Sequence, residues 1–255
     1  MTSLWLLKLL LVPSLILGVT LAGRRFGPDI AGWLSAFPIL SGPILLIVAL
    51  EQGAEFAATA AHGTLLAVLA ILVFSLIYAW AAQRRGWQDC IILALCGYGL
   101  AVLGLRQLDT SLPVSFGSVI GALLLVPLAF PSVPRWVTGR VATGDLPWRL
   151  ASAAALVLLV TFAAPHFGPR LSGLLAMFPV MSTVLVGFSH RQSGGQFATR
   201  LLRGMVYGYF SFACFCAVLA LTLVDLGIAA AFSAALAVAL LVHVVTRRLV
   251  RKSSV

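Results

Sequence analysis

Two acidic residues one helical turn apart, Glu51 and Glu55, are the side chains of this chain best suited to carrying a proton. Their i, i+4 spacing puts both on one face if a single helix runs through them. A carboxylate close to hydrocarbon holds its proton more tightly than in water and can take it up and release it. We therefore predict Glu55, and after it Glu51, as proton-coupling residues. The alternative is that both are solvated acids in an outer loop.

A second pattern places hydroxyl groups one turn after a proline. Pro38 precedes Ser41, and Pro179 precedes Ser182 and Thr183. Proline removes a backbone donor and breaks a helix, and in hydrocarbon the freed carbonyl needs another partner, which a hydroxyl can supply. Transporters place their substrates at such breaks near mid-membrane. We predict these five residues as substrate-binding, whereas the alternative is two kinks used for packing.

One further cation belongs to the predicted substrate site. Arg191 stands beside His190 and Gln192, shortly after the second proline segment. An arginine at the inner end of this segment can meet an anionic group that approaches from the cytoplasm.

Both prolines belong to a block that occurs twice. Residues 26–63 and 167–204 align without a gap at a constant offset of 141 residues, and 12 of 38 positions are identical. The identities include glycines, prolines and phenylalanines, which shape a backbone, rather than the Leu, Val and Ala that apolar helices match by chance. Gln192 and Gln196 stand where the first copy has Glu51 and Glu55.

The composition is that of a helical membrane protein. Apolar residues make up 61% of the chain and charged residues 9%, against about 25% in soluble domains. Several continuous apolar stretches exceed the roughly 18 residues that cross a bilayer. The sequence predicts an all-α integral membrane protein with nine transmembrane helices, at about 3–22, 29–50, 55–82, 88–105, 113–132, 148–165, 170–189, 197–223 and 227–246.

The basic residues predict the orientation. A net charge of +10 would suit nucleic acid, but these residues lie in clusters between apolar stretches. With the N-terminus outside and the C-terminus in the cytoplasm, 14 of the 17 Lys and Arg residues face inward and 3 face outward. This agrees with the positive-inside rule and requires an odd number of spans.

The offset and the orientation together predict the domain organisation. Residues 1–106 form a first repeat of four spans, 107–147 hold a linker helix and a cytoplasmic loop, and 148–255 form a second repeat. Because five crossings separate equivalent points, the repeats run in opposite directions, with their helices broken at Pro38 and Pro179. Inverted repeats of this kind are typical of secondary transporters.

No pattern in the sequence indicates an enzyme. Metal-ligand clusters, phosphate-binding loops and Ser-His-acid sets are absent, and the four cysteines lack zinc spacing. We expect no cofactor, no resident metal and no nucleic-acid partner. Membrane lipids and a small-molecule or lipid-linked substrate are the expected partners, and the sequence leaves a homodimer open.

The second copy of the block resembles the GlpM-like family of small bacterial inner-membrane proteins. The resemblance rests on residues 171–179, a turn with glycine and basic residues near 191–195, and residues 200–204; residues 30–38 of the first copy are similar. In that family a similar stretch opens a helix hairpin, and its members look like half of this chain. The resemblance implies two fused units in a bacterial inner membrane, a link to exopolysaccharide production such as that of alginate, and no firm substrate.

Three functions remain open from the sequence. The first is a secondary transporter that moves a small solute or metabolite by alternating access, with protons as the candidate coupling ion. The second is a flippase for lipids or lipid-linked sugars, which would need cationic residues such as Arg191, Arg200 and Arg203 near the head group. The third is a non-transporting assembly subunit with a packed centre.

Overall fold

The computed structural model describes residues 14, 16–22, 25–38, 41–108, 110–134, 146–163 and 178–254. Within these ranges every regular element is an α-helix, which confirms the predicted all-α class. The start of the first predicted span, the start of the seventh and most of the segment that carries the family resemblance lie outside the described residues. The helices described over their full length are α2 (Pro28–Ser35), α3 (Ser41–Gln52), α4 (Ala54–Ala81), α5 (Trp87–Leu105), α6 (Leu112–Ala129), α7 (Leu146–Ala163), α9 (Val180–Leu226) and α10 (Ile228–Ser254).

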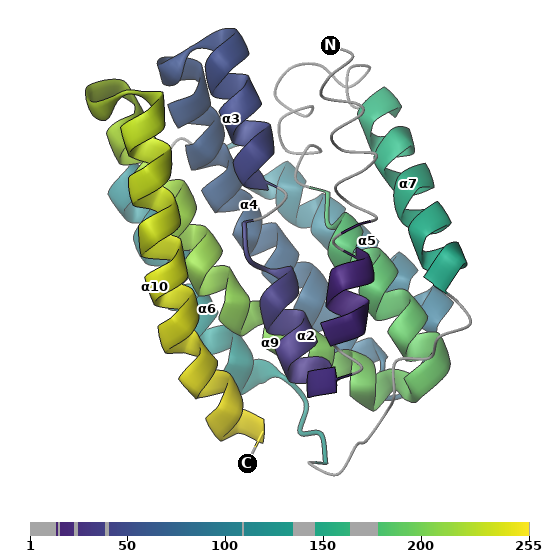
Figure 1. Ribbon diagram of the computed structural model, residues 1–255. Coiled ribbons are helices and arrows are strands. Elements are labelled where there is room, and N and C mark those ends of the chain that lie inside the picture. The colour runs from purple at the N-terminus through teal and green to yellow at the C-terminus, as the bar shows by residue number, and fades with distance from the viewer. Residues whose placement is uncertain are drawn as a thin grey trace.

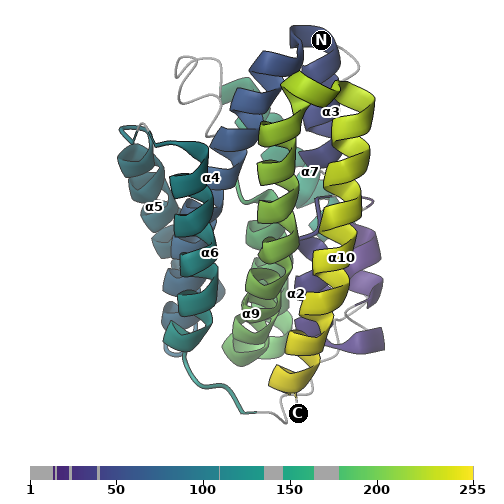
Figure 2. The same cartoon turned by 90° about the vertical axis from the view of Figure 1, so that its left-hand side faces the viewer.

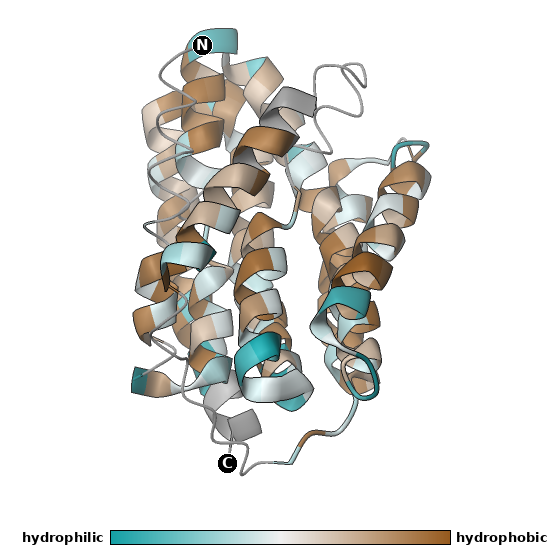
Figure 3. Cartoon of the chain, turned by 90° about the vertical axis from the view of Figure 1, so that its right-hand side faces the viewer, coloured by the Kyte–Doolittle hydropathy of each residue, from teal (hydrophilic) through white to brown (hydrophobic). Residues whose placement is uncertain are grey.

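Five of the described helices are long and apolar enough to cross a membrane: α4, α5, α6, α9 and the part of α10 up to Arg248. Their outward faces are apolar as well. Leu128 of α6 is 81% exposed and Leu241 of α10 is 68% exposed. Figure 3 shows apolar residues along the length of the helices and polar residues gathered mainly near their ends. Apolar faces of this extent need lipid rather than water around them.

The two longest helices, α4 and α9, pack against each other and hold most of the others. Helices α5 and α6 contact α4, whereas α2, α7 and α10 contact α9. Figure 2 shows α5 and α6 on one side of the bundle and α10 on the other. The core between α4 and α9 contains many alanines, such as Ala57 and Ala61, which are fully buried and let the backbones approach closely.

Two glycines bend the chain in the same way. Gly53 between α3 and α4 has φ 90° and ψ 170°, and Gly194 inside α9 has φ 84° and ψ 169°. This backbone region is open essentially to glycine alone. The two residues are 141 positions apart in the duplicated block. Gly53 precedes the start of α4, whereas Gly195 lies against the carbonyl of Ala82 at the end of α4. The two bends therefore lie at opposite ends of α4.

The first bend corrects one expectation about the acidic pair. Glu51 lies in the last turn of α3, which ends at Gln52, and Glu55 lies in the first turn of α4, which begins at Ala54, so no single helix runs through both residues. Their i, i+4 spacing does not place them on one helical face, because Gly53 redirects the chain between them.

The predicted break at Pro38 is present. Helix α2 ends at Ser35 and α3 begins at Ser41, and Figure 1 shows α2 in the lower half of the bundle and α3 in the upper half. Helix α9 begins directly after Pro179. The carbonyl of each proline accepts a hydrogen bond from the backbone N–H four residues later. Gly42 N–H donates to Pro38 at 2.9 Å, and Thr183 N–H donates to Pro179 at 2.8 Å. The carbonyls of both prolines thus find partners inside the protein.

Helix α2 packs on α9 through glycines. A side chain at Gly204 would overlap the carbonyl of Asp29, and one at Gly32 would overlap the carbonyl of Leu201. Asp29 also forms an ion pair with Arg200 of α9. Small residues and one ion pair therefore fix α2 against α9 at close range.

A buried arginine joins α7 to α9. Arg149 is fully buried; its guanidinium donates to Gln192 at 3.0 Å and to Ser189 at 3.4 Å. It also lies over the ring of Phe188, with 5.6 Å between the guanidinium carbon and the ring centroid. The first segment of α9 is thus tied to α7 close to the bend at Gly194.

The contact between α2 and α9 makes a direct prediction about stability. Gly204→Ala should lower the thermal unfolding midpoint of the purified protein by about 4 °C or more, because the methyl group forces two backbones apart. Gly99→Ala in α5 is the matched control, since a side chain there meets no atom within 4 Å. Alanine favours a helix over glycine by about 1 kcal/mol, so the control should unfold at an equal or higher temperature. Equal midpoints for Gly204→Ala and the wild type would contradict the packing.

Candidate functional site

The break at Pro38 and the start of α9 after Pro179 line one cavity of about 430 Å³. Its volume lies in the range of small-molecule sites, about 300–1,000 Å³. The wall combines the break between α2 and α3, the face of α3 towards α4, the first half of α4, the start of α9 and the middle of α9. The lining residues are Ser35, Ala36, Phe37, Ser41, Ile44, Leu45, Val48, Phe56, Thr59, Ala60, Gly63, Thr64, Ile71, Phe178, Pro179, Val180, Met181, Ser182, Tyr209 and Phe212.

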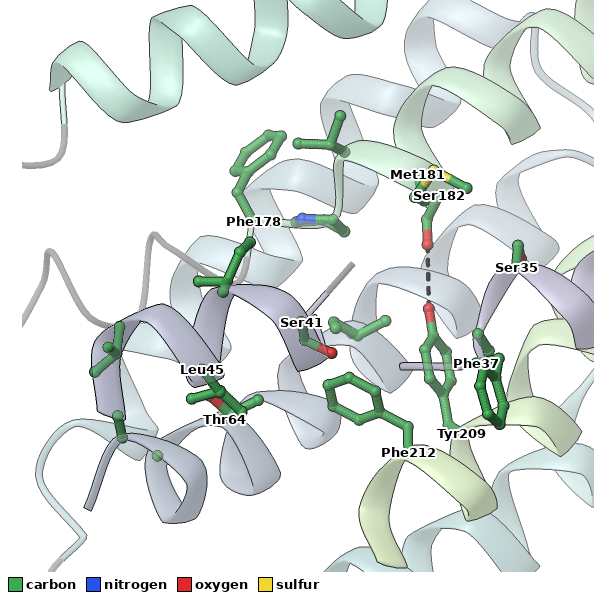
Figure 4. A pocket seen from close by; sticks show the side chains of 18 of the residues that line it. Ser35, Phe37, Ser41, Leu45, Thr64, Phe178, Met181, Ser182, Tyr209 and Phe212 are labelled. Carbon is green, nitrogen blue, oxygen red and sulfur yellow. Dashed lines mark hydrogen bonds between the residues drawn. The ribbon is translucent and has the colours of Figure 1, made fainter. Parts of the chain in front are cut away.

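The described lining is aromatic and aliphatic with a few hydroxyl groups, and it contains no charged side chain. Four phenylalanines, Phe37, Phe56, Phe178 and Phe212, contribute to it. The hydroxyl of Ser182 lies 3.3 Å from the hydroxyl of Tyr209, and Figure 4 shows this pair at one side of the cavity. A site of this composition suits a ligand with a large apolar part and a small polar part.

Ser41 presents a hydroxyl that the described protein does not satisfy. Ser41 is 8% exposed, and its Oγ has no hydrogen-bond partner among the described residues. Figure 4 shows this oxygen turned towards Phe212 and Tyr209, away from the body of α3. A buried hydroxyl without a partner costs stability, so a polar group inside the cavity would compensate for it.

Two helices begin at this cavity. Helix α3 begins at Ser41 and α9 begins at Val180, and both residues line the cavity. The Val180 N–H donates to the Phe178 carbonyl at 2.7 Å, which leaves the next amides of that turn, before Thr183, without a helical partner. The first N–H groups of an α-helix have no intrahelical carbonyl to bond, and they carry about half a positive charge in total. The cavity therefore combines apolar walls with two partly positive backbone ends.

A buried histidine lies behind Phe37. The His243 ring stacks on Trp33 with 3.7 Å between ring centroids and meets Phe37 edge-on at 4.9 Å. Its Nδ1 lies 3.0 Å from the Ser211 hydroxyl, while Trp33 Nε1–H donates to Thr246 at 3.1 Å. These contacts from α9 and α10 fix the aromatic end of the broken helix that reaches the cavity.

The structure brings together part of the predicted substrate site. Ser41, Pro179 and Ser182 line the cavity, and Pro38 lies in the same break, with its carbonyl bonded to Gly42. Thr183 and Arg191 line a different groove.

The two acids lie elsewhere. Glu51 and Glu55 are exposed on either side of the bend at Gly53, and neither lines the cavity. Their role as coupling residues stays a prediction.

The second groove, of about 440 Å³, lies between α5, α7 and the first segment of α9. Thr183 lines it and has no hydrogen-bond partner for its Oγ1 among the described residues. The Arg191 guanidinium lies over the ring of Trp87, 6.0 Å from the ring centroid. Ser182 and Thr183 are neighbours in sequence, so the first turn of α9 separates the cavity from the groove.

Sequence reasoning missed the residues that α9 contributes to the far wall. Tyr209 and Phe212 lie beyond residue 204, where the duplicated block ends, so the alignment gave no reason to select them. One signal was available for Tyr209, because a tyrosine inside an apolar span needs a partner for its hydroxyl. Phe37 and Phe178 are identical in both copies and could have been selected on that ground.

No protein-family model, curated protein or solved structure matches this chain. The resemblance to the GlpM-like family thus stays a prediction. Within the described ranges, no group of three or more His, Cys, Asp or Glu side chains is placed to hold a metal ion. The function therefore has to be argued from the geometry of the cavity.

The cavity predicts which buried positions water-borne reagents can reach. In a variant with alanine at all four native cysteine positions, Ser41→Cys and Ser182→Cys should react with a small maleimide within minutes. Ser75→Cys is the control, since Ser75 is fully buried in α4 and lines neither the cavity nor the groove. It should react only after unfolding. Mass spectrometry measures the extent of labelling. Equal protection of all three cysteines would show that the centre is packed.

Proposed function

We propose that this protein is a small secondary transporter of the bacterial inner membrane that moves a solute by alternating access. In this proposal nine transmembrane helices form two inverted repeats, 1–106 and 148–255, joined by 107–147, with the N-terminus outside. The observation that carries the proposal is the shared cavity, because the break at Pro38 and the start of α9 after Pro179, which are 141 residues apart, line it together. Substrate sites of inverted-repeat transporters lie at such paired breaks.

Three backbone features support the inverted arrangement. The bonds from Gly42 to Pro38 and from Thr183 to Pro179 are equivalent in the alignment. The bends at Gly53 and Gly194 have the same dihedral angles and lie at opposite ends of α4. In addition, α5 begins at Trp87 and α10 at Ile228, which are also 141 residues apart. Corresponding hairpins therefore turn at opposite ends of the bundle.

A difference between the halves supports alternating access. Phe56 lines the cavity and is 53% exposed, whereas the equivalent Phe197 is fully buried. Ala60 also lines the cavity, while its equivalent Leu201 is 1% exposed. The cavity thus extends along the α3–α4 hairpin and is closed along the equivalent part of α9. If the halves exchange these conformations, the same central residues become open towards the other side of the membrane.

Exchange of this kind can be followed with cysteines at equivalent positions. In the cysteine-free background, Ala60→Cys should react with a membrane-impermeant thiol reagent added to the face at Gly53. Leu201→Cys should react only with reagent added to the face at Gly194, and more slowly, because it is buried in this state. Leu65→Cys is the control, since Leu65 and its equivalent Val206 are both fully buried. Intact cells expose the outer face of the membrane to the reagent, and inverted vesicles expose the cytoplasmic face.

The outcomes separate the transporter from the assembly subunit and from a binding protein that opens to one side only. Reaction from opposite faces at the two positions supports alternating access. Reaction at Ala60→Cys alone indicates a one-sided binding protein, and protection at both positions indicates an assembly subunit; either result would overturn the proposal.

The groove beside α7 favours flipping of lipids as the second candidate. It lies between helices, it is largely apolar, and Arg191 stacked on Trp87 offers a cation for a head group. Of the three arginines expected near a head group, only Arg191 lines the groove, while Arg200 pairs with Asp29.

This second candidate predicts lipid movement in reconstituted vesicles. Wild-type protein should expose inner-leaflet fluorescent phosphatidylglycerol to dithionite, and Arg191→Gln should slow that exposure several-fold by removing the charge. Arg248→Gln, at the end of the membrane-spanning part of α10, is the matched control. Rates equal to those of protein-free vesicles would exclude the flippase.

A further inference from the structure

We propose that the cavity binds an organic monocarboxylate, with its carboxylate at Ser41 between the starts of α3 and α9 and its apolar body among the phenylalanines. This inference rests on the proposed transport function and names the class of substrate. It follows from four properties of the described site: the backbone ends, the hydroxyl of Ser41, the absence of charged side chains from the lining, and the aromatic wall.

The backbone ends set the sign and the size of the charge. Each helix start carries about half a positive charge, so α3 and α9 together offer about one. That matches one negative charge and falls short of the two carried by a phosphate monoester. The described lining contains no carboxylate that would attract a cation. It also contains no Lys or Arg that a dianion would need.

Hydrogen bonding places the carboxylate at Ser41 rather than at Ser182. The Ser182 hydroxyl is already engaged by Tyr209 at 3.3 Å and by the Met205 sulfur at 3.6 Å. The Ser41 hydroxyl has no partner among the described residues and is directed into the cavity. The backbone N–H of Ser41 lies in the first turn of α3. The next amide, that of Gly42, is the first in α3 to donate to a backbone carbonyl, that of Pro38. A carboxylate oxygen can accept from both groups of Ser41.

The walls determine the rest of the ligand. Phe37, Phe178 and Phe212 line the same cavity as Ser41, and the cavity continues between α3 and α4 past Leu45. Aromatic and aliphatic walls gain little from a sugar or a polyol, but they bury an aromatic ring or a short alkyl chain favourably. Low local dielectric also strengthens the attraction between the helix starts and the carboxylate.

Three probes of nearly equal shape and different charge test the proposal: phenylacetate, phenylacetamide and phenethylamine. Binding to the purified full-length protein is measured by titration calorimetry and by the shift of the thermal unfolding midpoint. We expect phenylacetate to bind at least tenfold more tightly than either other probe. Ser41→Ala should weaken phenylacetate binding about tenfold, in keeping with loss of a hydrogen bond to a charged group. Ser233→Ala is the matched control, because Ser233 is exposed on α10 and bonds only its own helix.

Each other result overturns the substrate class. Equal binding of the amide or the amine would remove the argument from charge, and an unchanged affinity in Ser41→Ala would remove Ser41 from the site. If none of the probes binds, the cavity does not take a small aryl carboxylate. None of these results affects the labelling of Ala60→Cys and Leu201→Cys, so transport by alternating access can stand when the monocarboxylate proposal fails.

Discussion

The structure depends on one constraint: a backbone N–H or carbonyl inside hydrocarbon has no water to bond. A helix can therefore break within the bilayer only where protein or an internal cavity covers the break. Pro38 and Pro179 meet this constraint in the same way, since each carbonyl accepts the amide of the residue four positions later. The amides that remain at the starts of α3 and α9 lie at a shared cavity. The break at Pro38 thus also places the start of α3 at the cavity.

Glycine sets where the chain is rigid and where it can turn. At Gly204 and Gly32 the missing side chain lets α2 lie directly on the backbone of α9. At Gly53 and Gly194 it permits a dihedral region that other residues avoid. The first pair holds α2 against α9, while Gly53 joins α3 to α4 and Gly194 joins the two segments of α9. Missing side chains thus produce a close helix contact at one pair of positions and a bend at the other.

The polar chemistry is divided between the ends and the centre. Charged residues such as Glu55 and Arg191 lie at helix ends or beside the groove, where head groups and water can solvate them, and Asp29 neutralises Arg200. The centre has hydroxyl groups and helix starts instead. This division lets the cavity carry a partial positive charge without a buried lysine or arginine, whose desolvation would cost several kcal/mol. It also leaves few residue types by which a sequence could reveal the ligand.

Composition and periodicity determined the helical class and the membrane environment. The duplicated block determined the break at Pro38 and the equivalence of Ser41 and Ser182, because these follow from local residue types and spacing. The sequence placed residues 51–54 between two predicted spans but left open whether one helix runs through Glu51 and Glu55, and the dihedral angles of Gly53 decided that question. Tyr209 and Phe212 could be assigned to the cavity only by the tertiary structure, because their place depends on how α9 crosses α4. The same packing decided that Phe56 is exposed and Phe197 buried. The phenylalanine is the same in both copies, so its identity cannot encode that difference, which arises from the neighbours that each helix meets.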